Sequence, residues 1–274
     1  MVVQHNLTAM NSNRMLGLTQ GTLSKSTEKL SSGYKINRAA DNAAGLAISE
    51  KMRRQVRGLT QASTNAQDGI SAVQTAEGAL NEVHDMLQRM NELAVQAAND
   101  TNMTTDRKYI QSEIDALVSE IDRVANTTTF NEQSLLNGSF TGKKLQVGSE
   151  GAATQTITLS IGAMSAAKLS IDGTKIDVKS HLAAQSAVKT IKSAMEKVSA
   201  QRSDLGAVQN RLEHTIKNLD NVVENTTSAE SAIRDTDMAT EMVRFSNQNI
   251  LQQAGQSMLA QANQSNQGVL SLLG

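Results

Sequence analysis

The sequence predicts a mainly α-helical fold, in which long antiparallel coiled-coil helices form a rod and the middle of the chain adds a small β-hairpin region. Three observations predict it. Apolar residues recur at alternating three- and four-residue steps between residues 43 and 99. The chain contains no proline that would break a helix. Between residues 139 and 180 the apolar period shortens to two, which is typical of strands.

The first thirty residues have the pattern of a sparse amphipathic helix, with apolar residues separated by Asn, Thr, Ser and Gln. Short helices carry a nucleation cost and gain little unless one face is packed, so we expect this arm to be disordered until it finds a partner. Residues 31–42 interrupt the apolar period. Asp41 or Asn42 should cap the helix that follows.

The stretch from residue 43 to 99 should form one coiled-coil helix, roughly 85 Å long at 1.5 Å per residue. Such a helix needs other long helices beside it. Its seam is predicted to include Ile48 and Met52 near the start, with Gln55 as a polar position. The main core residues of the seam are expected to be Leu59, Val73, Leu80, Val83, Leu87 and Met90.

After a polar turn, Ile110, Ile114 and Ile121 mark a second amphipathic helix, and a short turn between two periodic helices makes an antiparallel hairpin. The region 139–180 then alternates apolar and polar residues around several glycines. Strands are predicted near Leu145 and Val147, near Ile157, Leu159 and Ile161, and near Ile176 and Val178.

The helical period returns from about His181, and its three-and-four spacing makes this segment the third partner of the long helix. Residues 226–274 mirror the first thirty. Each arm alone buries too little apolar surface to offset the entropy of ordering, so we expect the two arms to pair on assembly. The apolar positions that should drive this assembly are Leu7, Leu23, Leu251, Met258 and Leu273.

These segments predict three parts. Residues 1–41 with 235–274 form a terminal coiled-coil domain, residues 42–138 with 181–234 form a helical core domain, and residues 139–180 form a short β-rich region.

Composition argues against several classes of protein. Only 2% of the 274 residues are aromatic, and enzyme pockets usually have aromatic walls. The formal charge is −1, which gives no electrostatic case for nucleic acid or an anionic membrane. His5, His84, His181 and His214 share no metal-ligand spacing, and we expect no metal, cofactor or catalytic site. The start lacks a conventional secretory signal and no apolar run approaches 18 residues, so we expect neither a Sec substrate nor a membrane-spanning protein.

Several runs resemble the signatures of one family, bacterial flagellin. At the amino-terminal end these are LSSGYKINRAADNAAGLAI at residues 30–48, GLTQAS at 58–63, NAQDGIS at 65–71 and TAEGALN at 75–81. At the other end they are AESAIRDTDMATEM at 229–242 and QSNQGVL at 264–270. Residues 139–180 have no clear counterpart, so the resemblance implies a minimal flagellin that lacks the large outer domains.

The resemblance implies a structural subunit that polymerises head to tail into the extracellular flagellar filament for motility. The terminal arms would line the filament channel, and the loop near residues 31–45 would join them to the surrounding tube. The subunit would travel unfolded through the flagellar type III export apparatus, with a chaperone on the carboxy-terminal arm. Filament cap and hook-junction proteins would be further partners.

The resemblance also implies recognition by host Toll-like receptor 5. The stretch LQRMNELAVQ at residues 87–96 matches the form that the receptor recognises, and Arg89, Leu93 and Glu113 match the family's main contact positions. Arg89 and Leu93 are four residues apart and should share a helix face. The simpler reading is that these residues make subunit contacts in the filament, which the host then exploits.

Three alternatives remain open at this stage. A hook-filament junction protein shares the terminal signatures, although the short middle region favours flagellin. A coiled-coil signalling rod of the chemosensory type would have a tight hairpin tip with near-symmetric heptads on either side, whereas here a β-like segment interrupts the rod. No constellation of residues supports an enzyme.

Overall fold

The computed structural model describes residues 6–173 and 175–270, and most of them lie in long helices. The chain divides into two compact units. The terminal unit comprises the described parts of Met1–Gln55 and Glu224–Gly274, and the central unit comprises those of Val56–Val223. The predicted mainly α fold, with long helices and a small antiparallel β region, is confirmed.

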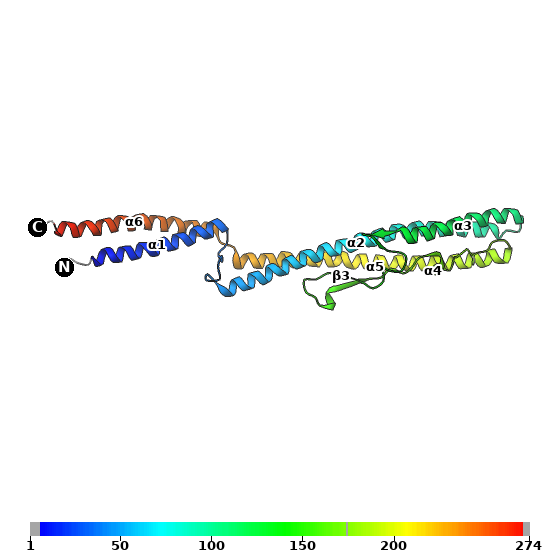
Figure 1. Cartoon of the computed structure of the whole chain (residues 1–274), viewed down its shortest axis with the longest axis horizontal. Coiled ribbons are helices and arrows are strands. Elements are labelled where there is room, and N and C mark those ends of the chain that lie inside the picture. Colours follow the sequence, from blue (N-terminus) through cyan, green and yellow to red (C-terminus); the bar gives the residue numbers. More distant parts are fainter. Residues whose placement is uncertain (1–5, 174, 271–274) are drawn as a thin grey trace. The chain divides into compact units, whose positions relative to one another are not determined.

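In the terminal unit, α1 (Leu7–Ser32) packs antiparallel against α6 (Met238–Leu270) (Figure 1). Asn6 caps α1 by accepting a hydrogen bond from a backbone N–H of the first turn, at 3.1 Å. Gly33 ends α1 with a φ of 75°, a left-handed conformation that glycine adopts without steric cost. Asp237 caps α6 in the same way as Asn6 caps α1. The two arms are therefore paired within one chain, while their ordering on assembly stays a prediction.

The loop at residues 33–42 is bound to the carboxy-terminal end of α5 (His181–Arg234). The backbone N–H of Lys35 donates to the carbonyl of Arg234 at 2.6 Å. The Arg234 guanidinium lies 4.6 Å from the centroid of the Tyr34 ring, a cation–π distance, and its Nη1 is 2.8 Å from a carboxylate oxygen of Glu50. These contacts join the loop and the start of α2 to the end of α5 within the terminal unit.

Asn42 caps α2 (Ala43–Ala97), since its side-chain oxygen accepts from the backbone N–H of Gly45 at 2.9 Å. The neighbouring carboxylate of Asp41 turns back into the loop instead. It accepts from the backbone N–H groups of Arg38 at 3.0 Å and Asn37 at 3.2 Å, and these bonds lower the pKa of Asp41 below 3.8. Of the two capping candidates, Asn42 is the one that caps the helix.

The predicted seam is wrong at the start of α2. Ile48 is 47% exposed and Gln55 is exposed, whereas Gly45 and Ser49 are buried. The buried stripe runs through positions 45, 49, 52, 56, 59 and 62, with positions 46, 53 and 58 half-buried beside it, so two three-residue steps follow each other between 56 and 62. An extra three-residue step rotates the buried stripe around the helix. The shift lies beside the boundary between the two units.

The central unit is a bundle of α2, α5 and α3 (Thr104–Thr127), in which α2 and α3 form the predicted antiparallel hairpin (Figure 1). Its largest core cluster draws apolar side chains from all three helices and from residues 135–178. The six residues expected to form the core are buried: Leu59 is 7% exposed, and Val73, Leu80, Val83, Leu87 and Met90 are fully buried.

In the described part of the chain, four short strands form two antiparallel pairs. β1 (Thr129–Phe130) pairs with β2 (Gln133–Ser134), and β3 (Lys143–Gln146) pairs with β4 (Thr156–Leu159). A 3₁₀ turn, η1 (Ala153–Gln155), precedes β4. The strands predicted near Leu145 and near Ile157 are therefore present as one hairpin.

The strand predicted near Ile176 and Val178 was wrong, although both side chains are buried. The backbone groups of this segment bond to a side chain of α3 rather than to a strand. Gln111 donates from Nε2 to the Ile176 carbonyl at 3.0 Å and accepts from the Val178 N–H at 2.9 Å. A short helix, α4 (Ala166–Leu169), lies earlier in the same region and was not predicted.

Candidate functional site

The contact between α1 and α6 is made largely by small and polar residues. Positions that are buried or half-buried follow a heptad spacing along both helices, and we call this set the α1–α6 seam. On α1 it comprises Ala9, Ser12, Leu16, Thr19, Leu23 and Ser26, and on α6 it comprises Glu241, Phe245, Gln248, Gln252, Gly255, Leu259 and Ala262. Few large apolar side chains therefore hold the pair together.

A buried hydrogen bond lies at one end of the seam. The hydroxyl of Ser26 donates to Oε1 of Glu241 at 2.6 Å, and the Glu241 residue is only 5% exposed. Arg244 approaches the other carboxylate oxygen at 3.5 Å. The position of Glu241 in the first turn of α6 is also favourable, because the amino-terminal end of a helix carries a partial positive charge.

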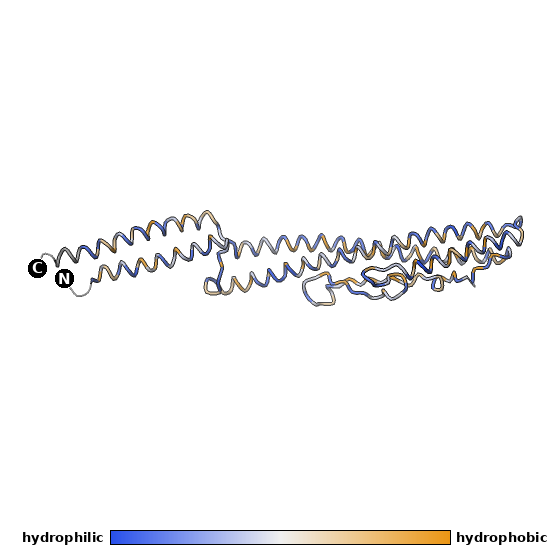
Figure 2. The backbone as a smooth tube through the Cα atoms, turned by 45° about the horizontal axis from the view of Figure 1, so that its top comes forward, coloured by the Kyte–Doolittle hydropathy of each residue, from blue (hydrophilic) through white to orange (hydrophobic). Residues whose placement is uncertain are grey.

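Most of the large apolar side chains that the structure describes on α1 and α6 point away from the seam. Leu7 is 68% and Leu18 is 62% exposed, and these two residues lie three turns apart on one face of α1. Exposed apolar residues lie on several sides of α6, and Figure 2 shows apolar positions spaced along both helices. The exposed set is Leu7, Met10, Met15 and Leu18 on α1, and Met238, Met242, Val243, Ile250, Leu251 and Met258 on α6. A helix that is apolar on several sides is normally buried, so these faces are suited to being covered by other chains.

A groove between the two helices adds to this surface. It has a volume of about 330 Å³ and is lined in part by Met15, Leu251 and Met258. A Cβ added at Gly255 would lie 3.3 Å from Cδ1 of Leu16, so glycine allows the helices to approach closely here.

The assembly positions predicted from the sequence have different environments. Leu7, Leu251 and Met258 are 68%, 53% and 63% exposed, so they lie on the outward faces. Leu23 is half-buried in the α1–α6 seam. Leu273 lies outside the described residues.

The predicted receptor-contact surface lies on the central unit, where α2 faces α3. Arg89 donates from Nε and Nη2 to one carboxylate oxygen of Glu113, at 3.0 and 2.8 Å. Its Nη1 lies 3.3 Å from a carboxylate oxygen of Glu92. The hydrogen bond to Glu113 is the main cause that raises the pKa of Arg89. About half of each side chain of Arg89 and Glu113 remains exposed, so both are accessible on the free subunit.

Leu93 does not lie on that surface, and its placement on an accessible face beside Arg89 was wrong. It is 2% exposed and belongs to the core cluster. Met90, Ala94 and Ala97 are also buried, because α2 is covered here by both α3 and α5, and two partners widen the buried sector of a helix. Glu92, which sequence reasoning did not single out, takes part in the exposed cluster instead, at an i, i+3 spacing from Arg89.

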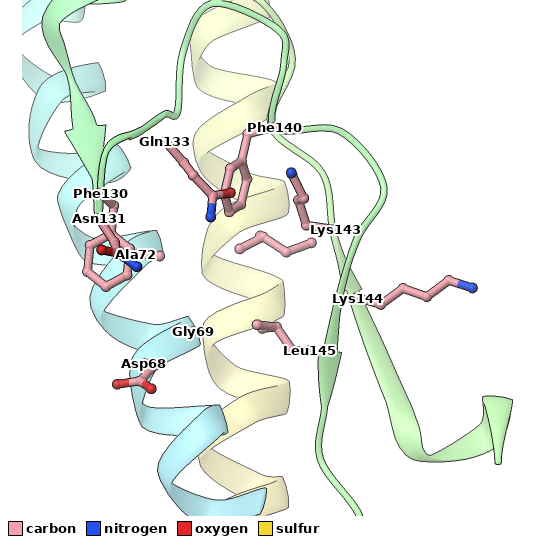
Figure 3. Close-up of a pocket in the computed structure, with 11 residues that line it drawn as sticks. Asp68, Gly69, Ala72, Phe130, Asn131, Gln133, Phe140, Lys143, Lys144 and Leu145 are labelled. Atoms are coloured by element: carbon pink, nitrogen blue, oxygen red, sulfur yellow. The ribbon is translucent and has the colours of Figure 1, made fainter. Parts of the chain in front are cut away.

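The central unit contains a pocket between α2 and the β region (Figure 3). It has a volume of about 250 Å³ and is lined by Phe130 and Phe140, two of the three phenylalanines of the chain. The Nζ of Lys143 lies 5.6 Å from the Phe140 ring centroid, while Lys144 points away from the cavity. Ligand pockets usually exceed about 300 Å³ and bury most of the ligand, so this shallow site is not a strong candidate.

Within residues 6–173 and 175–270, no group of His, Asp and Glu side chains is arranged to hold a metal ion. In the same part of the chain, no helix combines the length and apolarity that a membrane span requires.

Comparison with known proteins gives consistent matches at both ends of the chain. Residues 3–141 match the model of the bacterial flagellin N-terminal helical region, and residues 188–273 match that of the C-terminal helical region. The chain is 54% identical over 273 residues to a flagellin of Halalkalibacterium halodurans and 50% identical over 303 residues to a flagellin of Bacillus subtilis, and each alignment covers both chains fully. The crystal structure of Bacillus cereus flagellin matches with a TM-score of 0.51 and 30% identity, covering 57% of this chain and 88% of that chain.

Proposed function

This chain belongs to the bacterial flagellin family and is a structural subunit of the flagellar filament, and from that premise we propose how it assembles and what recognises it. Subunits join head to tail through residues 1–41 and 235–274, which form an inner coiled-coil domain of the filament. Residues 42–138 with 181–234 form the helical core domain, and residues 139–180 form a short variable region. The contact is heterologous, so it does not close and a filament grows.

The observation that carries the assembly proposal is the outward orientation of the large apolar side chains of α1 and α6. Ile250 on α6 is 64% exposed, and Leu18 on α1 is 62% exposed. Fully burying one Leu or Ile side chain is worth about 1.5–3 kcal/mol, so covering several of them in a polymer supplies a strong drive for association. The small and polar residues of the α1–α6 seam offer no comparable gain to the isolated pair.

The same exposure supports the proposed export route. The subunit passes unfolded through the flagellar type III apparatus, and a chaperone covers the carboxy-terminal arm before export. An arm with apolar residues on several sides associates with other chains unless a partner covers it. At the distal end of the filament and at its base, cap and hook-junction proteins take the place of neighbouring subunits.

Paired variants of α6 test the assembly proposal in the full-length chain. Replacing the exposed Leu251 and Met258 by Asn removes apolar surface from α6. Replacing the exposed Gln256 and Gln261 by Asn introduces the same residue with a similar decrease in helix propensity but removes no apolar side chain. We expect the first variant to raise the critical concentration for polymerisation at least about tenfold and the second to leave it within about twofold. Sedimentation and negative-stain electron microscopy measure both.

A version lacking residues 1–41 and 235–274 complements these variants. Filaments from the full chain and soluble monomer from the trimmed chain would support assembly through the terminal arms. Equal polymerisation of Leu251→Asn/Met258→Asn and wild type, or filaments from the trimmed chain, would refute it.

We also propose that Toll-like receptor 5 recognises the central unit through Arg89 and Glu113. The two side chains are half-exposed and held together by two hydrogen bonds, so the guanidinium is already oriented when a partner approaches. Leu93 is only 2% exposed, so in this proposal it supports the surface from the core.

Arg89→Ala is expected to weaken receptor binding at least about tenfold, because truncating an arginine at an interface hot spot costs about 2 kcal/mol or more and about 1.4 kcal/mol is tenfold. Arg123→Ala is the matched control, since Arg123 forms a similar exposed ion pair with Glu120 on α3. Interferometry with immobilised receptor measures both affinities. Unchanged binding of Arg89→Ala, or an equal loss with Arg123→Ala, would remove Arg89 from the proposed contact.

A further inference from the structure

Methionine is concentrated on the outward faces of α1 and α6. Of the methionines that the structure describes, those that are exposed all lie on these two helices except Met103, which is 73% exposed at the start of α3. The five on the terminal unit are 47–63% exposed: Met10, Met15, Met238, Met242 and Met258. In contrast, Met90 and Met164 in the central unit are buried.

These five residues are separate from the contact that pairs the two helices. The α1–α6 seam, as defined above, contains no methionine. A chemical change at the five thioethers therefore alters the outward faces and leaves the Ser26–Glu241 hydrogen bond and the packing of Leu16 against Gly255 in place. Two of the five, Met15 and Met258, also line the groove between the helices.

Exposed thioethers react with two-electron oxidants such as peroxides. A sulfur lone pair attacks one oxygen of hydrogen peroxide, the O–O bond breaks and an S–O bond forms. The released hydroxide takes the proton from that oxygen, so the products are a sulfoxide and water. The sulfur is oxidised by two electrons and the peroxide is reduced by two. Stereospecific methionine sulfoxide reductases reverse the change.

We propose that Met10, Met15, Met238, Met242 and Met258 form an oxidative modification site that controls entry of the free subunit into the filament. The proposal rests on the proposed function, in which other copies cover these faces. A sulfoxide turns an adaptable apolar side chain into a polar one with a strong acceptor oxygen. Burying that oxygen against the apolar face of a neighbouring copy without a donor opposes association. Oxidised subunits therefore stay in solution until they are reduced.

The test uses the full-length chain and hydrogen peroxide. Peptide mass spectrometry follows each methionine, sedimentation measures polymerisation, and far-ultraviolet circular dichroism follows the helices. In wild type we expect sulfoxide at the five sites and at Met103, with Met90 and Met164 unmodified. The critical concentration for polymerisation should rise at least about tenfold while helicity is unchanged.

Two variants separate the five sites from other damage. In the five-site variant all five methionines become Leu, a swap that nearly conserves volume. It should polymerise after peroxide within about twofold of its untreated level. Met103→Leu, which removes only the exposed methionine of the central unit, should lose polymerisation as wild type does. Equal loss in the five-site variant and wild type, or normal polymerisation of wild type oxidised at all five sites, would overturn the proposal.

Reduction gives a readout that does not depend on how well the five-site variant assembles. Treating oxidised wild type with both stereospecific reductases should restore polymerisation to within about twofold of the untreated level. If mass spectrometry shows the five sulfoxides reduced and polymerisation remains lost, the proposal is wrong. If untreated wild type does not polymerise at all, the assembly proposal fails instead, so the two failures are distinguishable.

Discussion

Leu87→Ala tests the packing of the central unit. Leu87 is fully buried in a cluster that draws on α2, α3 and α5. The substitution removes three carbons, which costs about 2.4 kcal/mol at about 0.8 kcal/mol per buried CH₂ group. A half-relaxed cavity of about 60 Å³ adds roughly 1.4 kcal/mol at about 24 cal/mol per Å³. The expected loss in free energy of unfolding is therefore about 4 kcal/mol.

A loss of that size lowers the Tm of a unit of this length by roughly 8–16 °C, at about 2–4 °C per kcal/mol. Thermal unfolding of the full chain, followed by circular dichroism, measures the shift. Leu182→Ala is the matched control, because it makes the same chemical change at a residue that is 74% exposed on α5. Its free energy of unfolding should change by less than about 0.5 kcal/mol. Equal Tm shifts in the two variants would contradict the assignment of Leu87 to the core.

Two other changes test the local contacts. Gln111→Leu should lower the free energy of unfolding by about 2–4 kcal/mol, because the buried backbone groups of Ile176 and Val178 lose their hydrogen-bond partner. Gln111→Glu should lose at least as much, because its buried carboxylate would face the Ile176 carbonyl and the Asp115 carboxylate without a donor, and chemical denaturation compares the two variants. The hydrogen bond from the Thr240 side chain lowers the pKa of Asp237 below its ordinary value of 3.8. The stability that the Asp237 cap gives α6 is therefore complete above the pKa of Asp237 in the unfolded chain, and it is lost as the pH falls through the lower pKa of Asp237 in the folded chain. Between pH 5 and pH 2, the helicity of Asp237→Asn should fall less than that of wild type, because the Asn amide caps the helix without titrating. Identical pH profiles of helicity in the two proteins would argue against the cap.

The terminal unit combines a weak internal contact with strong outward ones. Its seam is small and polar apart from a few residues, while its large apolar residues are left for other chains. A subunit built this way gains little by ordering its arms alone and much by ordering them against neighbours. The buried Ser26–Glu241 hydrogen bond favours one alignment of α1 against α6, since sliding either helix would leave a carboxylate buried without its partner.

Much of the fold follows from local patterns in the sequence. The heptad spacing from Leu59 onward determined which face of α2 is buried, because each seam residue needs only a partner helix on that side. The absence of proline permitted helices as long as α2 and α5. Asn42 belongs to a residue type that caps helices, and it caps α2. The family signatures at both ends of the chain also identified the filament subunit without any structure.

The tertiary structure decided the features that depend on how many partners surround a residue. Leu93 is buried because two helices cover α2 at that level, which a single-helix pattern does not reveal. Ile176 and Val178 alternate like a strand, yet the Gln111 side chain satisfies their backbone and no strand pairs with them. Periodicity reports which residues avoid water along one element, whereas the identity of the group that covers or bonds them is set by segments far away in the sequence.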